Sequence, residues 1–141
     1  ITYNAHNGNW AYGAQLEATL RTQRNSEGYN KGNAFKATTW LNRKVTASFS
    51  GSLRLEFNAW EDYSGHDDEI HGMRNMAPIA DNDLRGGTRL DVLLGCNYLI
   101  REGFLKDNML SFEVGMPVYQ SLDGPNLETD LIVNVGWHIF F

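Results

Sequence analysis

The chain has 141 residues, of which 12 are Lys or Arg and 17 are Asp or Glu, so its formal net charge is −5. This length suits one domain, and an acidic chain whose basic residues do not cluster is a poor candidate for binding nucleic acid. No stretch approaches the roughly 18 consecutive apolar residues of a membrane-spanning helix. Mean hydropathy is −0.42, but alternating strands average out their hydropathy, so this value does not exclude a membrane β-barrel.

The beginning of the chain predicts one short element and one clear strand. The chain starts at Ile1 without an initiator Met, so we expect a signal sequence or a longer upstream segment to have been removed. Residues 1–8 predict a turn or the end of a strand. From residue 10, apolar and polar residues alternate strictly, and a period of two predicts a strand with one apolar face. That face holds Trp10, Tyr12, Ala14, Leu16, Ala18 and Leu20.

The next two predicted strands lie on either side of a short turn. Residues 23–33 are polar and rich in Gly and Asn, which predicts a loop. Residues 34–41 predict a strand with less regular alternation, and residues 42–44 predict a tight turn. Residues 45–58 predict a third strand as clear as the first. Its apolar face holds Val45, Ala47, Phe49, Gly51, Leu53, Leu55 and Phe57.

The second half of the chain repeats the pattern. Residues 61–87 lack periodicity and are rich in Asp, Gly and His, so they predict a long loop. Residues 89–98 and 110–118 alternate again and predict the fourth and fifth strands, with a turn at 101–108 between them. Residues 120–129 predict another loop before the final strand.

The last strand, residues 131–141, has a regular alternation that runs to the end of the chain. Its length is sufficient for a tilted strand to cross a bilayer. It also stops on an aromatic residue. This combination resembles the C-terminal signature strand of Gram-negative outer-membrane β-barrels, which the outer-membrane assembly machinery recognises. The resemblance rests on residues that we expect to face lipid, namely Leu131, Val133, Val135, Trp137, Ile139 and Phe141.

The connections between the six predicted strands are in turn long, short, long, short and long. In bacterial outer-membrane barrels the C-terminus lies on the periplasmic side, where connections are short, and the extracellular loops are long. Placing the C-terminus in the periplasm puts every predicted connection on the side that its length requires. Aromatic residues of the apolar faces also fall near strand ends, where the two membrane–water interfaces would lie. They are Trp10, Tyr12, Tyr98 and Trp137 at one end, and Phe35 and Phe57 at the other.

These patterns predict an all-β fold, an antiparallel transmembrane β-barrel, in a single domain over residues 1–141. A spanning sheet must close, because an open edge leaves backbone groups unpaired in hydrocarbon, and single-chain barrels start at eight strands. We therefore expect the six strands to be the C-terminal part of a larger barrel of about 12 strands. The alternative is self-association, in which two copies of six strands form one barrel. A soluble β-sandwich or lipocalin-like barrel is a third alternative.

Residues 115–130 contain a distinctive hairpin sequence. It has Pro117-Val118-Tyr119-Gln120, a short loop with Gly124-Pro125, and Leu127-Glu128-Thr129-Asp130. This stretch resembles the last hairpin of outer-membrane transporters of the MetA-pathway-of-phenol-degradation family, and the resemblance covers roughly residues 109–141. It implies a passive outer-membrane channel for small molecules, such as hydrophobic or aromatic compounds, and it transfers no catalytic residue.

The polar faces of the predicted strands would line the lumen of such a barrel. Antiparallel pairing of the third and fourth predicted strands allows a register with Glu56 across from Arg89 and Arg54 across from Asp91. Charges arranged in this way can form a constriction that selects solutes or a ladder of ion pairs that braces the wall. We favour the ladder, although both can hold together. The candidate lumen-lining residues are Glu17, Arg21, Arg54, Glu56, Arg89, Asp91, Glu113, Asp130 and His138.

The predicted loop 61–87 contains a candidate metal site at His66, Asp68 and His71. Imidazole and carboxylate ligands suit zinc, copper or nickel, but the spacing matches no established motif, so a solvated acidic loop is the preferred interpretation. A catalytic Asp/His group would need side chains from opposed walls of a rigid cleft. We therefore expect no metal, no cofactor and no enzymatic activity. The single cysteine, Cys96, lies on the predicted lipid-facing side and would serve packing.

The predicted function is passive passage of small molecules across the bacterial outer membrane. The alternative is a structural or anchoring barrel that does not transport and whose extracellular loops bind a partner. In both cases outer-membrane lipid and the barrel-assembly machinery are the expected partners. Self-association or missing N-terminal strands would then close the barrel.

Overall fold

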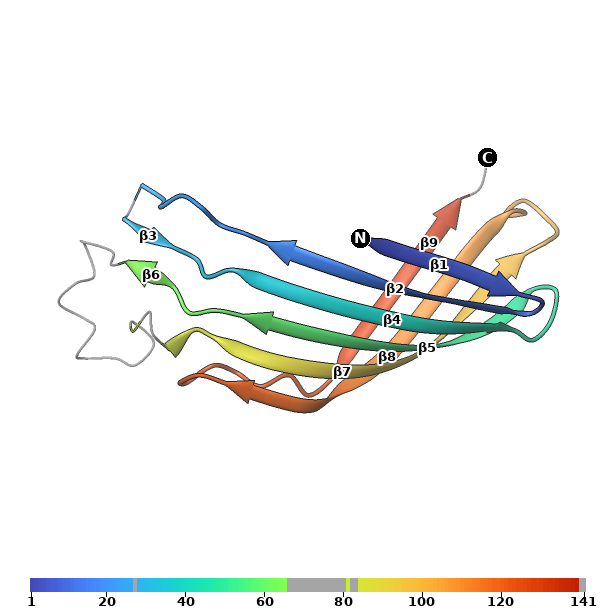
Figure 1. The fold of residues 1–141 in the computed structure, drawn as a ribbon. Helices are drawn as coiled ribbons and strands as arrows, with labels where there is room; N and C mark the ends of the chain where they lie inside the picture. The colour runs from blue at the N-terminus through green and yellow to red at the C-terminus, as the bar shows by residue number, and fades with distance from the viewer. Residues whose placement is uncertain (27, 66–80, 82–83, 140–141) are drawn as a thin grey trace.

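The computed structural model describes residues 1–26, 28–65, 81 and 84–139, which form two antiparallel sheets (Figure 1). The larger sheet has seven strands whose spatial order is their order in the chain. They are β1 (Thr2–Asn7), β2 (Trp10–Thr19), β4 (Ala34–Lys44), β5 (Phe49–Trp60), β7 (Gly87–Ile100), β8 (Asn108–Leu122) and β9 (Ile132–Ile139). The smaller sheet pairs β3 (Tyr29–Asn30) with β6 (Ser64–Gly65). The prediction of an all-β, antiparallel fold is confirmed.

The large sheet contains one strand more than the six that the alternation predicts. The segment expected to be a turn forms β1, which pairs along β2 from Thr2 opposite Gln15 to Asn7 opposite Trp10. A two-residue turn joins the strands, and Gly8 adopts a φ of 58° there, a conformation that favours glycine in tight hairpins. Pattern alone misses β1 because its outward side chains are only Tyr3, Ala5 and Asn7.

The predicted turn at 42–44 is wrong, because β4 continues to Lys44 and the turn is formed by residues 45–48. Local hydrogen bonds close this turn. The backbone N–H groups of Val45 and Thr46 both donate to the carbonyl of Phe49, at 3.0 and 3.1 Å. The Thr46 hydroxyl accepts from the N–H of Phe49 at 3.0 Å. Short hydroxyl side chains stabilise turns in this way, even where the sequence alternates like a strand.

A β-bulge interrupts the alternation of β8. Leu90 pairs with Tyr119 and Asp91 with Pro117, so Val118 is the extra residue. Proline lacks the N–H that a ladder needs and is found at bulges and strand edges. The β8–β9 ladder also stops short of Pro117, at the pair Gly115–Ile132. The predicted faces of β8 therefore hold only up to the bulge.

Long and short connections alternate along the chain, as predicted. The short ones are 8–9, 45–48 and 101–107, and they lie at one end of the sheet (Figure 1). The long ones lie at the opposite end. Two of them are tied together, because β3 and β6 lie within them and pair there.

The sheet is strongly curved, and β8 and β9 turn away from the direction of β2, β4 and β5 (Figure 1). It does not close: β1 and β9 are its two edges, and within the described ranges each pairs on one side only. The described part of the chain therefore forms an open seven-stranded wall, and the prediction of six strands is wrong. Among the same residues, no helix is long and apolar enough to cross a membrane.

The two faces of the sheet differ in a way that leaves almost no apolar core. Within the described residues, Leu93 is the one buried hydrophobic side chain, 2% exposed. Leu94, the next residue, points to the other face and is 62% exposed. Large apolar residues of the outward face are exposed on every long strand: Trp10, Tyr12, Leu16, Phe35, Leu41, Phe49, Leu53, Leu55, Tyr98, Leu110, Phe112, Met116, Val135 and Trp137.

Candidate functional site: the polar concave face

The inner face of the curved sheet carries a polar hollow of about 360 Å³. Strands near both ends of the sheet contribute to it, since Glu17 comes from β2 and His138 from β9. The wall therefore curves around this hollow. Its lining residues are Gln15, Glu17, Lys36, Thr38, Trp40, Asn42, Ser52, Arg54, Glu56, Asn97, Ser111, Glu113, Asn134 and His138.

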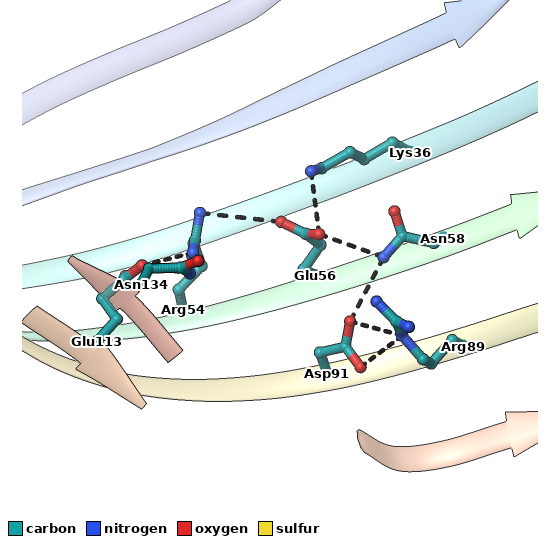
Figure 2. A network of polar contacts seen from close by, with 8 residues as sticks. All are labelled: Lys36, Arg54, Glu56, Asn58, Arg89, Asp91, Glu113 and Asn134. Carbon is teal, nitrogen blue, oxygen red and sulfur yellow. Dashed lines mark hydrogen bonds and ion pairs between the residues drawn. The ribbon is translucent and has the colours of Figure 1, made fainter. Parts of the chain in front are cut away.

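Four charged side chains form an alternating series along the hollow, which we call the ion-pair chain: Lys36, Glu56, Arg54 and Glu113 (Figure 2). Lys36 Nζ lies 2.9 Å from Glu56 Oε1. Arg54 lies 3.8 Å from the other Glu56 oxygen through Nη1 and 2.5 Å from Glu113 Oε2 through Nη2. Asn134 extends the series to β9, because its Nδ2 donates to Glu113 Oε2 at 3.3 Å. The series thus links β4, β5, β8 and β9.

Glu113 reaches Arg54 across an intervening strand. Strands that are neighbours-but-one lie roughly 10 Å apart, and β7 separates β8 from β5. At the crossing point β7 has Gly95, which pairs with Glu113 on one side and with Ser52 on the other. A Cβ added at Gly95 would lie 2.6 Å from both Glu113 Cγ and Ser52 Oγ. The absence of a side chain at Gly95 therefore leaves the path open for this ion pair.

A second charged pair lies next to the ion-pair chain, on β7. Asp91 is 1% exposed, and Arg89 Nε lies 2.9 Å from its Oδ1. Arg89 also donates from Nη1 to Thr129 Oγ1 at 2.8 Å. A nearly fully buried carboxylate needs such a partner, because an unpaired buried charge is strongly unfavourable.

The cross-strand pairs expected from the sequence, Glu56 with Arg89 and Arg54 with Asp91, do not form. The register places Glu56 directly opposite Asp91 and Asn58 opposite Arg89. Two carboxylates facing each other are destabilising, and Asn58 lies between them. Its Nδ2 donates to Glu56 Oε1 at 3.3 Å and to Asp91 Oδ2 at 3.5 Å (Figure 2). Each carboxylate also has its own cation, Lys36 or Arg89.

Of the remaining candidate lumen residues, two line the hollow and two lie outside it. Glu17 and His138 line the hollow, and Glu17 lies opposite Lys36 in the β2–β4 register. Arg21 lies beyond the end of β2, and its guanidinium donates to the carbonyl of Gly32 in the following loop. Asp130 precedes β9, is exposed and lies outside the hollow.

These contacts also involve three residues that are not among the lumen-lining candidates from the sequence, namely Lys36, Asn58 and Asn134. Alternation does place Lys36 on the polar face, opposite Phe35. Charge alone does not reveal the two amides, because their role depends on which side chains the register brings beside them. An uncharged residue between two acids becomes visible only once the strands are aligned.

The outward side of β9 carries four of the residues expected to face lipid, Val133, Val135, Trp137 and Ile139, and all four are exposed. Trp137 Nε1 donates to Asn108 Oδ1 on β8 at 2.7 Å. Leu131 is exposed just before the strand. The sixth member, Phe141, lies outside the described residues.

Outward aromatic residues gather near the end of the sheet with the short connections. Trp10 is the first residue of β2, and the Arg43 guanidinium lies over its ring at 5.1 Å from the ring centroid. Phe49 pairs with Tyr98 in the register. Towards the opposite end, Phe35 and Phe57 are in contact, with ring centroids 6.5 Å apart.

The inner face continues from the polar hollow towards the short connections. A second hollow of about 470 Å³ shares Asn42 and Asn97 with the first. Its lining also includes the apolar side chains of Ala11, Leu99 and Met109. The inner surface therefore changes from charged at its middle to less polar at this end.

The candidate metal ligands His66, Asp68 and His71 lie outside the described residues. Elsewhere, in the part of the chain that the structure describes, no group of three or more His, Cys, Asp or Glu side chains is placed to hold a metal ion. Cys96 is half-buried on the outward face of β7 and is not in a disulfide. Comparison of the chain with protein-family models, with curated proteins and with solved structures found no match.

Proposed function

We propose that this sheet is part of the wall of a transmembrane β-barrel of a bacterial outer membrane, and that the barrel lets small molecules pass passively. The observation that carries the proposal is the contrast between the two faces. The outward face exposes apolar side chains on every long strand, and the charged side chains of these strands lie on the concave face, apart from Arg43 beside Trp10. In a water-soluble protein, a sheet with one face in water normally buries its apolar face and exposes its polar face. Lipid outside and water inside would match both faces.

The dimensions of the strands support the same proposal. A strand tilted by about 45° needs roughly 9–11 residues to cross the hydrocarbon core. The five strands β2, β4, β5, β7 and β8 have 10, 11, 12, 14 and 15 residues. Outward aromatic side chains near both strand ends would lie at the membrane interfaces. Long connections at one end and short ones at the other are also typical of these barrels.

The charges of the concave face indicate what kind of solute would pass. Acids and bases alternate along the ion-pair chain, and Asp91 is matched by Arg89. Matched charges largely cancel each other's field beyond a few ångströms, so strong preference for anions or cations is not expected. Passage of small, weakly charged or aromatic molecules, which the resemblance of residues 115–130 would imply, is compatible with this balance of charges.

The test is reconstitution of the full-length protein into lipid vesicles and planar bilayers. We expect it to need detergent for extraction, to conduct ions, and to let small neutral solutes swell the vesicles. Protein that stays in aqueous buffer without detergent would contradict the membrane assignment. Protein that inserts into bilayers but neither conducts nor passes solutes would contradict the transport function alone.

One observation favours the alternative of a non-transporting barrel that binds a partner through its loops. Described residues of two long connections contact each other: Tyr29 and Tyr63 stack with centroids 5.9 Å apart and an interplanar angle of 3°. Asp62 Oδ1 accepts from the backbone N–H groups of Arg85 and Gly86 at 2.7 and 2.5 Å. Loop residues that such contacts hold in place can take part in recognition. This alternative predicts an electrically silent barrel that loses a partner when residues 61–86 are shortened.

A further inference from the structure

We infer that an odd number of further strands, different in sequence from residues 1–141, completes the wall by pairing antiparallel to both β1 and β9. The inference rests on the proposed membrane function. It excludes closure by direct contact between β1 and β9, both within one chain and between two copies in the same orientation. Three features of the sheet support it, namely its edges, its strand directions and the placement of its connections.

The two edges are suited to pairing. Sheet edges that face water usually carry charged residues or proline, which prevent association with other strands. β1 (TYNAHN) and β9 (IVNVGWHI) contain no Lys, Arg, Asp, Glu or Pro. The outward side of β9 is also strongly apolar, with Val135 79% exposed. In hydrocarbon the unpaired N–H and C=O groups of both edges would be strongly unfavourable, so both must have neighbours.

The directions of the strands determine which neighbours are allowed. All six strand pairs of the large sheet are antiparallel, and spatial order equals chain order. Seven alternating strands begin and end in the same direction, so β1 and β9 run parallel to each other. Joining them would create a parallel seam, whereas bacterial outer-membrane barrels are antiparallel throughout and have even strand numbers. Seven strands reach an even number only when an odd number is added.

The twelve-stranded dimer considered from the sequence assumed six strands per copy, whereas the large sheet has seven. Six strands per copy would have met in antiparallel seams, but the additional strand β1 changes the direction of one edge. A second copy inserted upside down would restore antiparallel contacts. However, it would place its long connections beside the short connections of the first copy, and barrels keep their long loops on one side.

The geometry also defines the chemistry of the added strands. The neighbour of β9 must continue an apolar outer surface beside Val133, Val135 and Trp137, and a polar inner surface beside Asn134 and His138. It needs roughly the eight residues of β9 to pair with the whole edge. One added strand reaches the smallest barrel of about eight strands, and five would give about 12.

The experiment uses disulfide formation in the full-length protein in membranes. Cys96→Ser removes the one cysteine of residues 1–141. Outward cysteines are then introduced pairwise at Tyr3 or Ala5 of β1 and at Val133 or Val135 of β9. The control pair, Ala5→Cys with Tyr12→Cys, lies at directly opposed positions of β1 and β2 and must form a disulfide. Hydrogen exchange is measured in the same membranes for the backbone amides of β1, β9 and the central strand β5.

We expect the control pair to cross-link, every β1–β9 pair to remain reduced, and the amides of β1 and β9 to be as protected as those of β5. A β1–β9 disulfide, within a chain or between copies, would overturn the inference while leaving the channel proposal intact. Fast exchange along β1 or β9 in membranes would overturn it as well, because the edges would then be free. Protein that never enters the membrane would instead contradict the proposed function.

Discussion

The two faces of β5 differ in the opposite sense from those of a water-soluble sheet. On its outward face Leu53 and Leu55 are 40% and 39% exposed. On its inner face the side chains of Arg54 and Glu56 are only 26% and 14% exposed, because each contacts other charged groups. Charged side chains are thus better covered than their apolar neighbours. The apolar side chains of the outward face therefore need a covering from outside the chain. The charged side chains of the inner face already have partners within the sheet.

The largest effect is expected from a charge on the outward face. Leu94→Arg places a cation at the middle of β7, and near the bilayer midplane a cation destabilises a barrel by about 2–4 kcal/mol. We expect the variant to fold into lipid vesicles only at correspondingly lower urea concentrations. Tryptophan fluorescence and the gel mobility of unheated samples measure this. Phe104→Arg, in the exposed connection 101–107, is the matched control and should fold normally. Equal stability of the two variants would indicate that water covers this face.

A smaller effect is expected at Gly95 on the inner face. Gly95→Ala puts a Cβ against Glu113 and Ser52, and such overpacking typically costs about 1–3 kcal/mol. The Arg54–Glu113 ion pair should open. Gly51→Ala is the control, because its Cβ would meet only the Gly95 carbonyl oxygen at 3.9 Å, an ordinary contact. Urea titration of both variants checks this, and equal midpoints would show that the path over β7 is not required.

Removing one member of the ion-pair chain should change selectivity more than stability. Arg54→Gln leaves Glu113 with Asn134 as its partner, so the inner face becomes more negative and should prefer cations. Because these side chains are partly exposed, we expect a stability loss of only about 1 kcal/mol. The reversal potential across a salt gradient measures the preference. The double variant with Glu113→Gln should restore the original value; a failure to do so would mean that the pair does not act on passing ions.

The smallest effect is expected in the short turn 45–48. Thr46→Ala removes the hydroxyl that accepts from the N–H groups of Ser48 and Phe49. An exposed hydrogen bond of this kind contributes roughly 0.5 kcal/mol, and conductance should not change. Ala47→Ser in the same turn is the control for a surface substitution. A loss as large as that of Gly95→Ala would mean that the turn contributes to the wall itself.

Elements with a strong period of two were predicted well, and the misses have identifiable physical causes. The strands predicted at residues 10–20 and 131–141 match β2 and β9 within a few residues over the part of the chain that the structure describes. The pattern misses β1 because Tyr3 is the one large apolar side chain on its outward side, so alternation gives little signal there. The pattern predicts a strand over 45–48 because Thr46 and Ser48 alternate with Val45 and Ala47.

The alternation of the chain was sufficient to assign side chains to faces, since successive residues of any extended strand point to opposite sides. It therefore determined that Arg54, Glu56 and Glu113 lie on one face and Leu53, Leu55 and Leu94 on the other. The tertiary structure alone decided which of them meet. The β5–β7 register is set across the long connection 61–86, where no local rule applies, and it paired Glu56 with Asp91. Curvature and the gap at Gly95 then brought Glu113 to Arg54, because contacts beyond adjacent strands depend on the shape of the whole sheet.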